Sequence, residues 1–197
     1  MRDRRDIYYI FLDTETTGLP YRMDAPSYAV WNWPRLVQIS WLAQDRKGRD
    51  ISKGSHIIRP DGFTIPRDVA RIHGITTERA MSEGIELEEA LKSFLRDTYF
   101  AECLVCHNTA FDKKVVGCEL YRTYGSDPIG IIPSRCTMLE STDWCDLPGF
   151  YGEPKWPKLQ ELHELLFGHG FIGAHDACAD VAATARCFWK LRRIGVM

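Results

Sequence analysis

The sequence predicts one α/β domain, spanning residues 1–197, that is built around a mixed β-sheet. Three observations lead to this prediction. The first apolar run lies at 7–13, two strand-like segments then flank a polar turn, and from residue 86 helical periodicity alternates with a short apolar strand. A length of 197 residues is also ordinary for a single domain with a sizeable core.

The first three elements are predicted to be strands. "IYYIFLD" at 7–13 is almost wholly apolar, and the Gly and Pro of the "TTGLP" that follows indicate a turn. "LVQISWLAQD" at 36–45 and "DISKGSHIIRP" at 50–60 carry the β-branched residues typical of strands. Because the polar "DRKGRD" joins them, we expect these two strands to form a hairpin.

The rest of the chain predicts helices interrupted by the short strand "CLVCHN" at 103–108. A helix over 86–100 presents one apolar face, made of Leu87, Ala90, Leu91, Phe94 and Leu95. A second helix over 109–125 is expected to be capped by Asn108 or Thr109 and to stop at Gly125. Two more follow at 159–168, ending at Gly168, and at 176–193, capped by Asp176.

Two long loops, 20–35 and 141–158, are rich in aromatic residues. Long loops inside a compact domain often carry function, so both are candidate functional segments. For any single Trp in them, we expect the ring to fold back onto a small core. The aromatic residues in question are Tyr21, Tyr28, Trp31, Trp33, Trp144, Phe150, Tyr151 and Trp156.

Composition excludes several classes of protein. The net charge of −2 gives no overall polybasic surface, although a groove can be basic on a neutral protein. There is no run of 18 apolar residues and no apolar core of a signal peptide, so we expect a cytoplasmic protein without membrane association. The seven Cys residues indicate reduced thiols. "CLVCH" at 103–107 matches a c-type haem pattern and offers a CxxC for zinc, but we interpret it as a buried strand.

Asp13 and Glu15 stand two residues apart where the first apolar run ends. On an extended chain their side chains point to the same face, and two carboxylates about 7 Å apart repel each other unless a cation lies between them. Asp112 and Asp180 each occupy the first turn or so of a predicted helix, where a carboxylate on its own is explained by the helix dipole. His175 lies just outside the last helix, five residues before Asp180.

Together these five residues predict a metal-dependent hydrolase. Four carboxylates suit a hard cation such as Mg²⁺ or Mn²⁺, and two such ions can clamp the attacking and leaving oxygens of a phosphodiester. An imidazole, whose ordinary pKa is about 6.5, can then accept a proton from the attacking water.

The segments "FLDTETTG", "HNTAFD" and "HDACAD" resemble the three motifs of the DEDDh group of 3′→5′ exonucleases. This group includes the proofreading subunit of bacterial replicative polymerases, RNase T and oligoribonuclease. "RLVQISW", "RIHGIT" and "KLQELHELLFG" add weaker likenesses, and the resemblance extends over residues 7–190. It implies an RNase H-like fold, in which helices flank a mixed five-stranded sheet.

The resemblance also implies a role for particular residues. Two Mg²⁺ or Mn²⁺ ions would be held by the carboxylates, with Asp13 bridging them and Asp112 acting through water, and His175 would be the general base. The metal-binding residues would be Asp13, Glu15, Asp112 and Asp180. The residues that contact the terminal nucleotide would be Thr16, through its backbone, and Leu19, Ile72, Asn108 and Phe111.

The predicted function is therefore metal-dependent release of nucleoside monophosphates from single-stranded or frayed 3′ ends of DNA, in repair or proofreading. An exoribonuclease of the RNase T or oligoribonuclease type is the alternative, because no residue here reads the 2′-OH. A DNA polymerase is a further partner that the resemblance suggests. The chain ends at Met197, soon after its last predicted helix, so we do not expect a fixed polymerase tether. The oligomeric state stays open.

Two rival readings explain less of the sequence. Haloacid-dehalogenase-type phosphatases also begin with a strand and two acids, as Asp13, Glu15 and Thr17 nearly do, but their later acidic pair is missing and His175 would have no role. An inactive module that only binds nucleic acid would be expected to lack an acid or the histidine, and this chain has all five.

Overall fold

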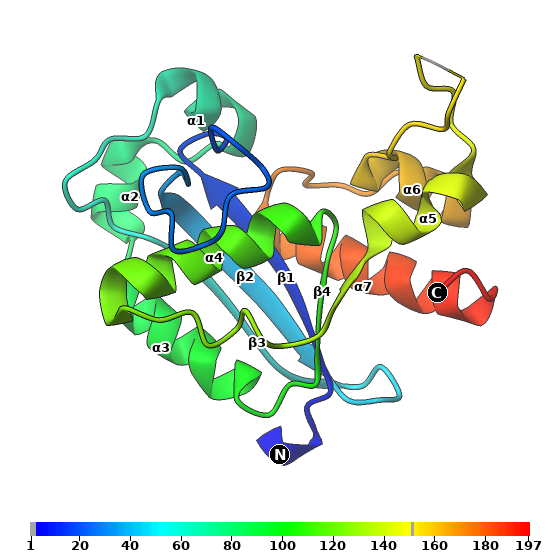
Figure 1. The fold of residues 1–197 in the computed structure, drawn as a ribbon, viewed down its shortest axis with the longest axis horizontal. Helices are drawn as coiled ribbons and strands as arrows, with labels where there is room; N and C mark the ends of the chain where they lie inside the picture. The colour runs from blue at the N-terminus through cyan, green and yellow to red at the C-terminus, as the bar shows by residue number, and fades with distance from the viewer. Residues whose placement is uncertain (1–2, 151) are drawn as a thin grey trace.

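The computed structural model describes residues 3–150 and 152–197, so Tyr151 lies outside the described residues. Within that part of the chain, five strands form one mixed sheet in the order β3-β2-β1-β4-β5 (Figure 1). β1 is central; it pairs antiparallel with β2 and parallel with β4. The strands are β1 (Tyr9–Thr16), β2 (Leu36–Gln44), β3 (Asp50–Ile57), β4 (Cys103–Cys106) and β5 (Ser134–Cys136). The mixed sheet and the β2–β3 hairpin predicted from the sequence are confirmed.

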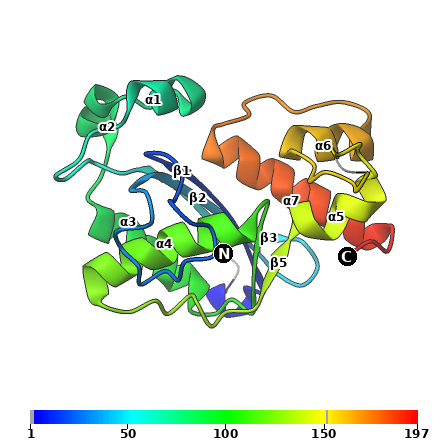
Figure 2. The same ribbon diagram turned by 45° about the horizontal axis from the view of Figure 1, so that its top comes forward.

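Helices cover both faces of this sheet, as Figures 1 and 2 show. α3 and α4 lie on one face and α7 on the other, with α5 and α6 beside α7, while α1 and α2 stand near the carboxyl end of β1. The helices are α1 (Arg67–His73), α2 (Thr77–Glu83), α3 (Leu87–Thr98), α4 (Thr109–Tyr124), α5 (Thr137–Cys145), α6 (Leu159–Phe167) and α7 (Ala177–Arg193). A short 3₁₀ turn, Arg4–Asp6, precedes β1.

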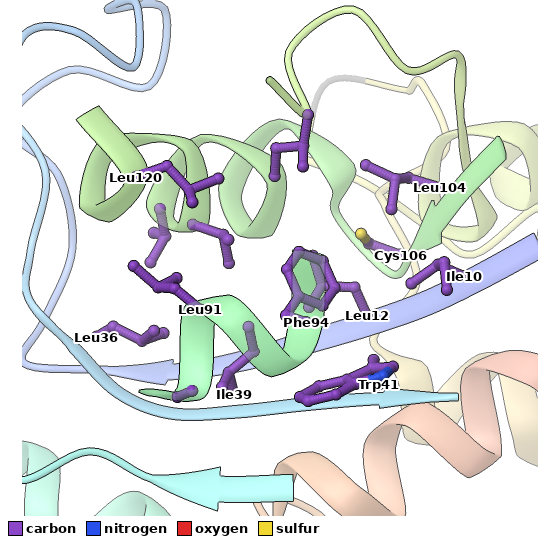
Figure 3. Packing of buried hydrophobic residues seen from close by; sticks show 14 of the residues in the cluster. Ile10, Leu12, Leu36, Ile39, Trp41, Leu91, Phe94, Leu104, Cys106 and Leu120 are labelled. Carbon is purple, nitrogen blue, oxygen red and sulfur yellow. The ribbon is translucent and has the colours of Figure 1, made fainter. Parts of the chain in front are cut away.

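The main core lies between the sheet and the α3–α4 layer (Figure 3). Ile10 and Leu12 of β1 meet Leu91 and Phe94 of α3 there, and all four side chains are fully buried. The predicted apolar face of this helix is confirmed, since the remaining members Ala90, Leu87 and Leu95 also pack into the same cluster. No helix in the described residues is both long enough and apolar enough to span a membrane.

Several element boundaries differ from those predicted. β1 begins at Tyr9 and continues to Thr16, so Glu15, which the predicted strand 7–13 left outside, lies within the strand together with Asp13. Helices α1, α2 and α5 and the strand β5 were not predicted, and α5 occupies the first residues of the segment 141–158, which was expected to be loop. Asn108 stands at the cap of α4 with φ 95°, but its side chain makes no capping hydrogen bond.

The segment 20–35 is a loop, as predicted, and it is fastened along α4. Arg122 donates hydrogen bonds to the carbonyls of Val30 and Trp33, and Lys114 donates one to the carbonyl of Met23. Trp33 folds back onto the core and is 3% exposed. The expectation that each loop Trp folds back is wrong for the others, because Trp31, Trp144 and Trp156 are exposed.

Candidate active site

The alternation of side chains along β1 decides which acids meet. Tyr9 and Phe11 pack against α7, whereas Ile10 and Leu12 face the α3–α4 core. Asp13 and Glu15 continue the row that faces α7, and Asp180 lies in the first turn of that helix. Ligand oxygens of these three carboxylates all lie within 4.8 Å of one another. The structure therefore brings together three of the four predicted acids.

Asp112 reaches the site from the opposite face of the sheet. It lies in the first turn of α4 and is 4% exposed. Its Oδ1 accepts hydrogen bonds from the backbone N–H of Thr14, at 3.1 Å, and from the Thr14 hydroxyl, at 2.8 Å. Thr14 belongs to the row of β1 that faces α4, so Asp112 is held beside the three-carboxylate cluster and not within it.

Burial and mutual repulsion make these carboxylates hard to ionise. Burial, followed by the charges of Asp112 and Asp180, raises the pKa of Asp13 well above its ordinary value. The same causes, burial first and Asp180 next, raise the pKa of Glu15 to about 8. Burial also raises the pKa of Asp180 to about 6, although the backbone N–H of His175 lowers it in part. A bound cation would remove this penalty, because it favours the ionised carboxylates.

His175 lies on the exposed turn before α7, which Figure 2 shows crossing from α6 to the start of α7. Its backbone has φ 67°, an uncommon value for a residue with a side chain. In this conformation its N–H donates to Oδ2 of Asp180 at 3.1 Å. The cap predicted at Asp176 is confirmed, since its carboxylate accepts from the N–H of Cys178 at 3.0 Å. The turn thus fixes the backbone of His175 to one of the cluster acids.

The predicted nucleotide-binding residues lie around the carboxyl end of β1. The side chains of Leu19 and Ile72 are 84% and 59% exposed, on the segment after β1 and in the last turn of α1. Phe111, in the first turn of α4, is only half-buried, with its ring 6.4 Å from that of Trp33. Asn108 directly precedes this helix. The Thr16 hydroxyl is occupied, because it donates to the carbonyl of Gly18 at 2.7 Å.

Sequence reasoning missed His73, which follows Ile72 in the "RIHGIT" segment. Its Nδ1 accepts the N–H of Ile75 at 3.1 Å, so the neutral ring carries its proton on Nε2. Nε2 is buried without a hydrogen-bond partner among the described residues. Burial lowers the pKa of His73, and the Thr16 backbone, which raises it, does not compensate. The segment "RIHGIT" is the sequence signal for His73, since it also holds Ile72, the residue that the resemblance implied.

The "CLVCH" segment has a structural role, as interpreted from the sequence. Cys103 and Cys106 are buried in β4, and every Cys in the described residues is a free thiol. The ring of His107 is hydrogen-bonded through Nδ1 to the Thr137 hydroxyl and through Nε2 to the carbonyl of Pro157. Burial lowers the pKa of His107 to about 4. This histidine therefore ties the start of α5 and the segment before α6 to the sheet.

Comparisons with known proteins agree with this geometry. The model of a family described as "Exonuclease" matches residues 10–188. An uncharacterized exonuclease, CP81, of Escherichia phage 186 is 26% identical over 184 residues, which cover 89% of this chain and 83% of the phage protein.

Solved structures of Exonuclease I share the fold. One from E. coli, described as suggesting how processivity is achieved, aligns with TM-score 0.74 and 20% identity over 94% of this chain and 40% of that one. The moderately thermophilic enzyme from Methylocaldum szegediense aligns with TM-score 0.72 and 22% identity over 95% of this chain and 40% of that one. The chain thus spans about 40% of the length of these structures. The arrangement of the sheet, the carboxylate cluster and the family match lead to one conclusion: the chain belongs to the exonuclease family.

Proposed function

We propose that this protein is a divalent-metal-dependent 3′→5′ exonuclease that releases nucleoside monophosphates from single-stranded or frayed 3′ ends of DNA. One observation carries the proposal: oxygens of Asp13, Glu15 and Asp180 converge within 4.8 Å. The exposed His175 is tied by its backbone to the same Asp180. Membership of the exonuclease family supports the reaction class.

The donor set fits a hard divalent cation. All three converging groups are carboxylates, the ligands that Mg²⁺ and Mn²⁺ prefer, and no Cys or His belongs to the cluster in the described residues. Asp13, Glu15 and Asp180 would hold the metal directly, while Asp112 would act from beside them through water. Two bound ions would neutralise the carboxylates and polarise the scissile phosphodiester.

The protein's own groups would position the substrate and move the proton. His175 is exposed to solvent next to the cluster, so its imidazole can accept the proton of an attacking water. Leu19 and Ile72 present exposed apolar surface beside the end of β1. A base that contacts these groups must be free of its complementary strand, which explains the preference for unpaired ends.

DNA is the favoured substrate because the similar Exonuclease I structures include complexes with dA16 and dT13 oligonucleotides. An enzyme that prefers frayed 3′ ends suits DNA repair or proofreading, where such ends arise. RNA is the second candidate, since a site of this kind accepts either sugar unless a side chain reads the 2′-OH.

The test compares oligonucleotides of one sequence, labelled at the 5′ end, as single-stranded DNA, duplex with a mismatched 3′ end, blunt duplex and single-stranded RNA. In Mg²⁺ we expect a ladder shortening from the 3′ end, fastest for single-stranded DNA and slowest for the blunt duplex. Asp13→Asn and EDTA should each abolish it. Activity that persists in EDTA, or a blunt duplex degraded as fast as the single strand, would refute the proposal.

A further inference from the structure

A groove of about 670 Å³ runs along α7 on the face opposite the α3–α4 layer. One wall is a face of α7, formed by residues three or four apart that line up along the helix: Ala179, Ala182, Arg186, Lys190 and Arg193. The other walls are the β2–β3 hairpin, around Gln44 to Asp50, and the segment around Phe167 and Ile172. We call this feature the α7 groove.

Among the described residues, the cations of the α7 groove form no ion pair with an acid. The three cations are Arg186, Lys190 and Arg193, and the ion pairs formed within residues 3–150 and 152–197 include none of them. The acid in the lining is Asp50, whose carboxylate accepts from the amide of Gln44 at 2.7 Å. Arg192, which directly precedes Arg193, does not line the groove; it contacts the Tyr9 hydroxyl and lies over aromatic rings. On a protein with net charge −2, the lining of this groove thus carries three cationic side chains against one carboxylate.

The hairpin wall is fixed to the helix. Nε1–H of Trp189 donates to Oε1 of Gln44 at 2.7 Å. At the turn, Gly48 has φ 77°, and a Cβ there would lie 2.9 Å from the Trp189 ring. Figures 1 and 2 both show this turn beside α7. One wall of the groove is therefore hydrogen-bonded to the helix that forms the other, which reduces the ordering needed on binding.

The α7 groove reaches the first turn of α7, the turn that carries Asp180 of the carboxylate cluster. Ala179 immediately precedes Asp180, and Ile172, which is 99% exposed, lies three residues before His175. A second cavity of about 490 Å³ shares lining residues with the groove and includes Cys178, at the start of α7. From Ala179 to Arg193 the helix extends about 21 Å, at about 1.5 Å per residue.

We propose that the α7 groove binds the phosphate backbone of the single strand that remains attached to the nucleotide being removed. This inference rests on the proposed exonuclease function, because removal of a 3′ nucleotide leaves the rest of the strand leading away from the metal site. Unpaired Arg and Lys side chains attract phosphates and release counterions from them. The first lining residues along α7, at the end of the helix that carries Asp180, are Ala179 and Ala182. Their small side chains leave room for the DNA strand.

The test removes two groove cations and compares a trinucleotide with a long single strand. The double variant Lys190→Gln/Arg193→Gln is matched by Lys92→Gln/Arg96→Gln, which removes the same charge from exposed positions of α3 on the opposite face of the sheet. For each protein, kcat/KM is measured in Mg²⁺ on both lengths of DNA and over a series of salt concentrations.

We expect the groove variant to reduce the advantage of the long strand over the trinucleotide by about tenfold, and the control to keep it. The salt dependence, log(kcat/KM) against log[salt], should become shallower by about 1.4 for the long strand, at about 0.7 per lost phosphate contact. If both double variants behave as the wild type, the α7 groove does not bind the strand. If the wild-type protein degrades neither substrate, the proposed function itself has failed.

Discussion

Replacement of Glu15 by Gln should stabilise the metal-free protein, increasingly so as pH rises. Burial raises the pKa of Glu15 from its ordinary value of 4.5 to about 8 in the folded chain. Between about pH 4.5 and pH 8 the folded chain therefore keeps a proton that the unfolded chain releases, so the free energy of unfolding falls with rising pH. Each pH unit within that window lowers the free energy of unfolding by about 1.4 kcal/mol. Between pH 5 and pH 7.5 the loss is about 3 kcal/mol.

Gln resembles the protonated acid and has no proton to lose, so Glu15→Gln should match the wild type near pH 4.5 and exceed it by about 3 kcal/mol near pH 7.5. Urea denaturation in EDTA across this range measures the difference. Glu164→Gln, at an exposed position of α6, is the control and should follow the wild-type curve. Parallel curves for wild type and Glu15→Gln would show that Glu15 ionises freely and that the repulsion argued for the cluster is absent.

Three further results are expected. Mg²⁺ should raise the melting temperature more at about pH 8 than at about pH 6, because it binds the ionised carboxylates. An equal rise at both pH values would show that Mg²⁺ binds outside the carboxylate cluster. His175→Ala should lower turnover by about 10²- to 10⁴-fold while keeping the Mg²⁺-dependent rise in melting temperature, and loss of both would make His175 a metal ligand. Thr14→Val should lower the free energy of unfolding by about 1–3 kcal/mol at about pH 8, because the ionised Asp112 loses the hydrogen bond from the Thr14 hydroxyl. An unchanged free energy would show that the hydrogen bond from the Thr14 backbone N–H is enough to hold Asp112.

The sequence predicted those parts of the site that depend on local periodicity. Asp13 and Glu15 share a face because strand side chains alternate, and Asp180 joins them because Asp176 caps the helix where predicted. Local periodicity could not place Asp112 on the other side of β1 from Asp180, because that depends on α4 lying across the sheet from α7. Only the family resemblance implied that Asp112 acts through water. Local periodicity also could not show that His73 would be buried against the end of β1.

The missed elements are short and depend on tertiary packing. α1 and α2 contribute Ala70 and Ala80 to a small cluster with Ile75, and neither helix repeats its apolar positions for long enough to be recognised. β5 has three residues and is recognisable only from its pairing with β4. Trp33 is buried because the loop around it is fastened to α4, which no local pattern in residues 20–35 reveals.

The division of β1 into two rows of side chains restricts how such a protein can change over evolution. Substitution of one residue in Tyr9–Thr16 alters one contact. Insertion or deletion of a single residue upstream of Asp13 would exchange the rows, turning both acids toward the α3–α4 core and apolar side chains toward Asp180. We therefore expect length variation among relatives to collect in loops such as 20–35 and to spare this strand, even where the sequences themselves have diverged widely.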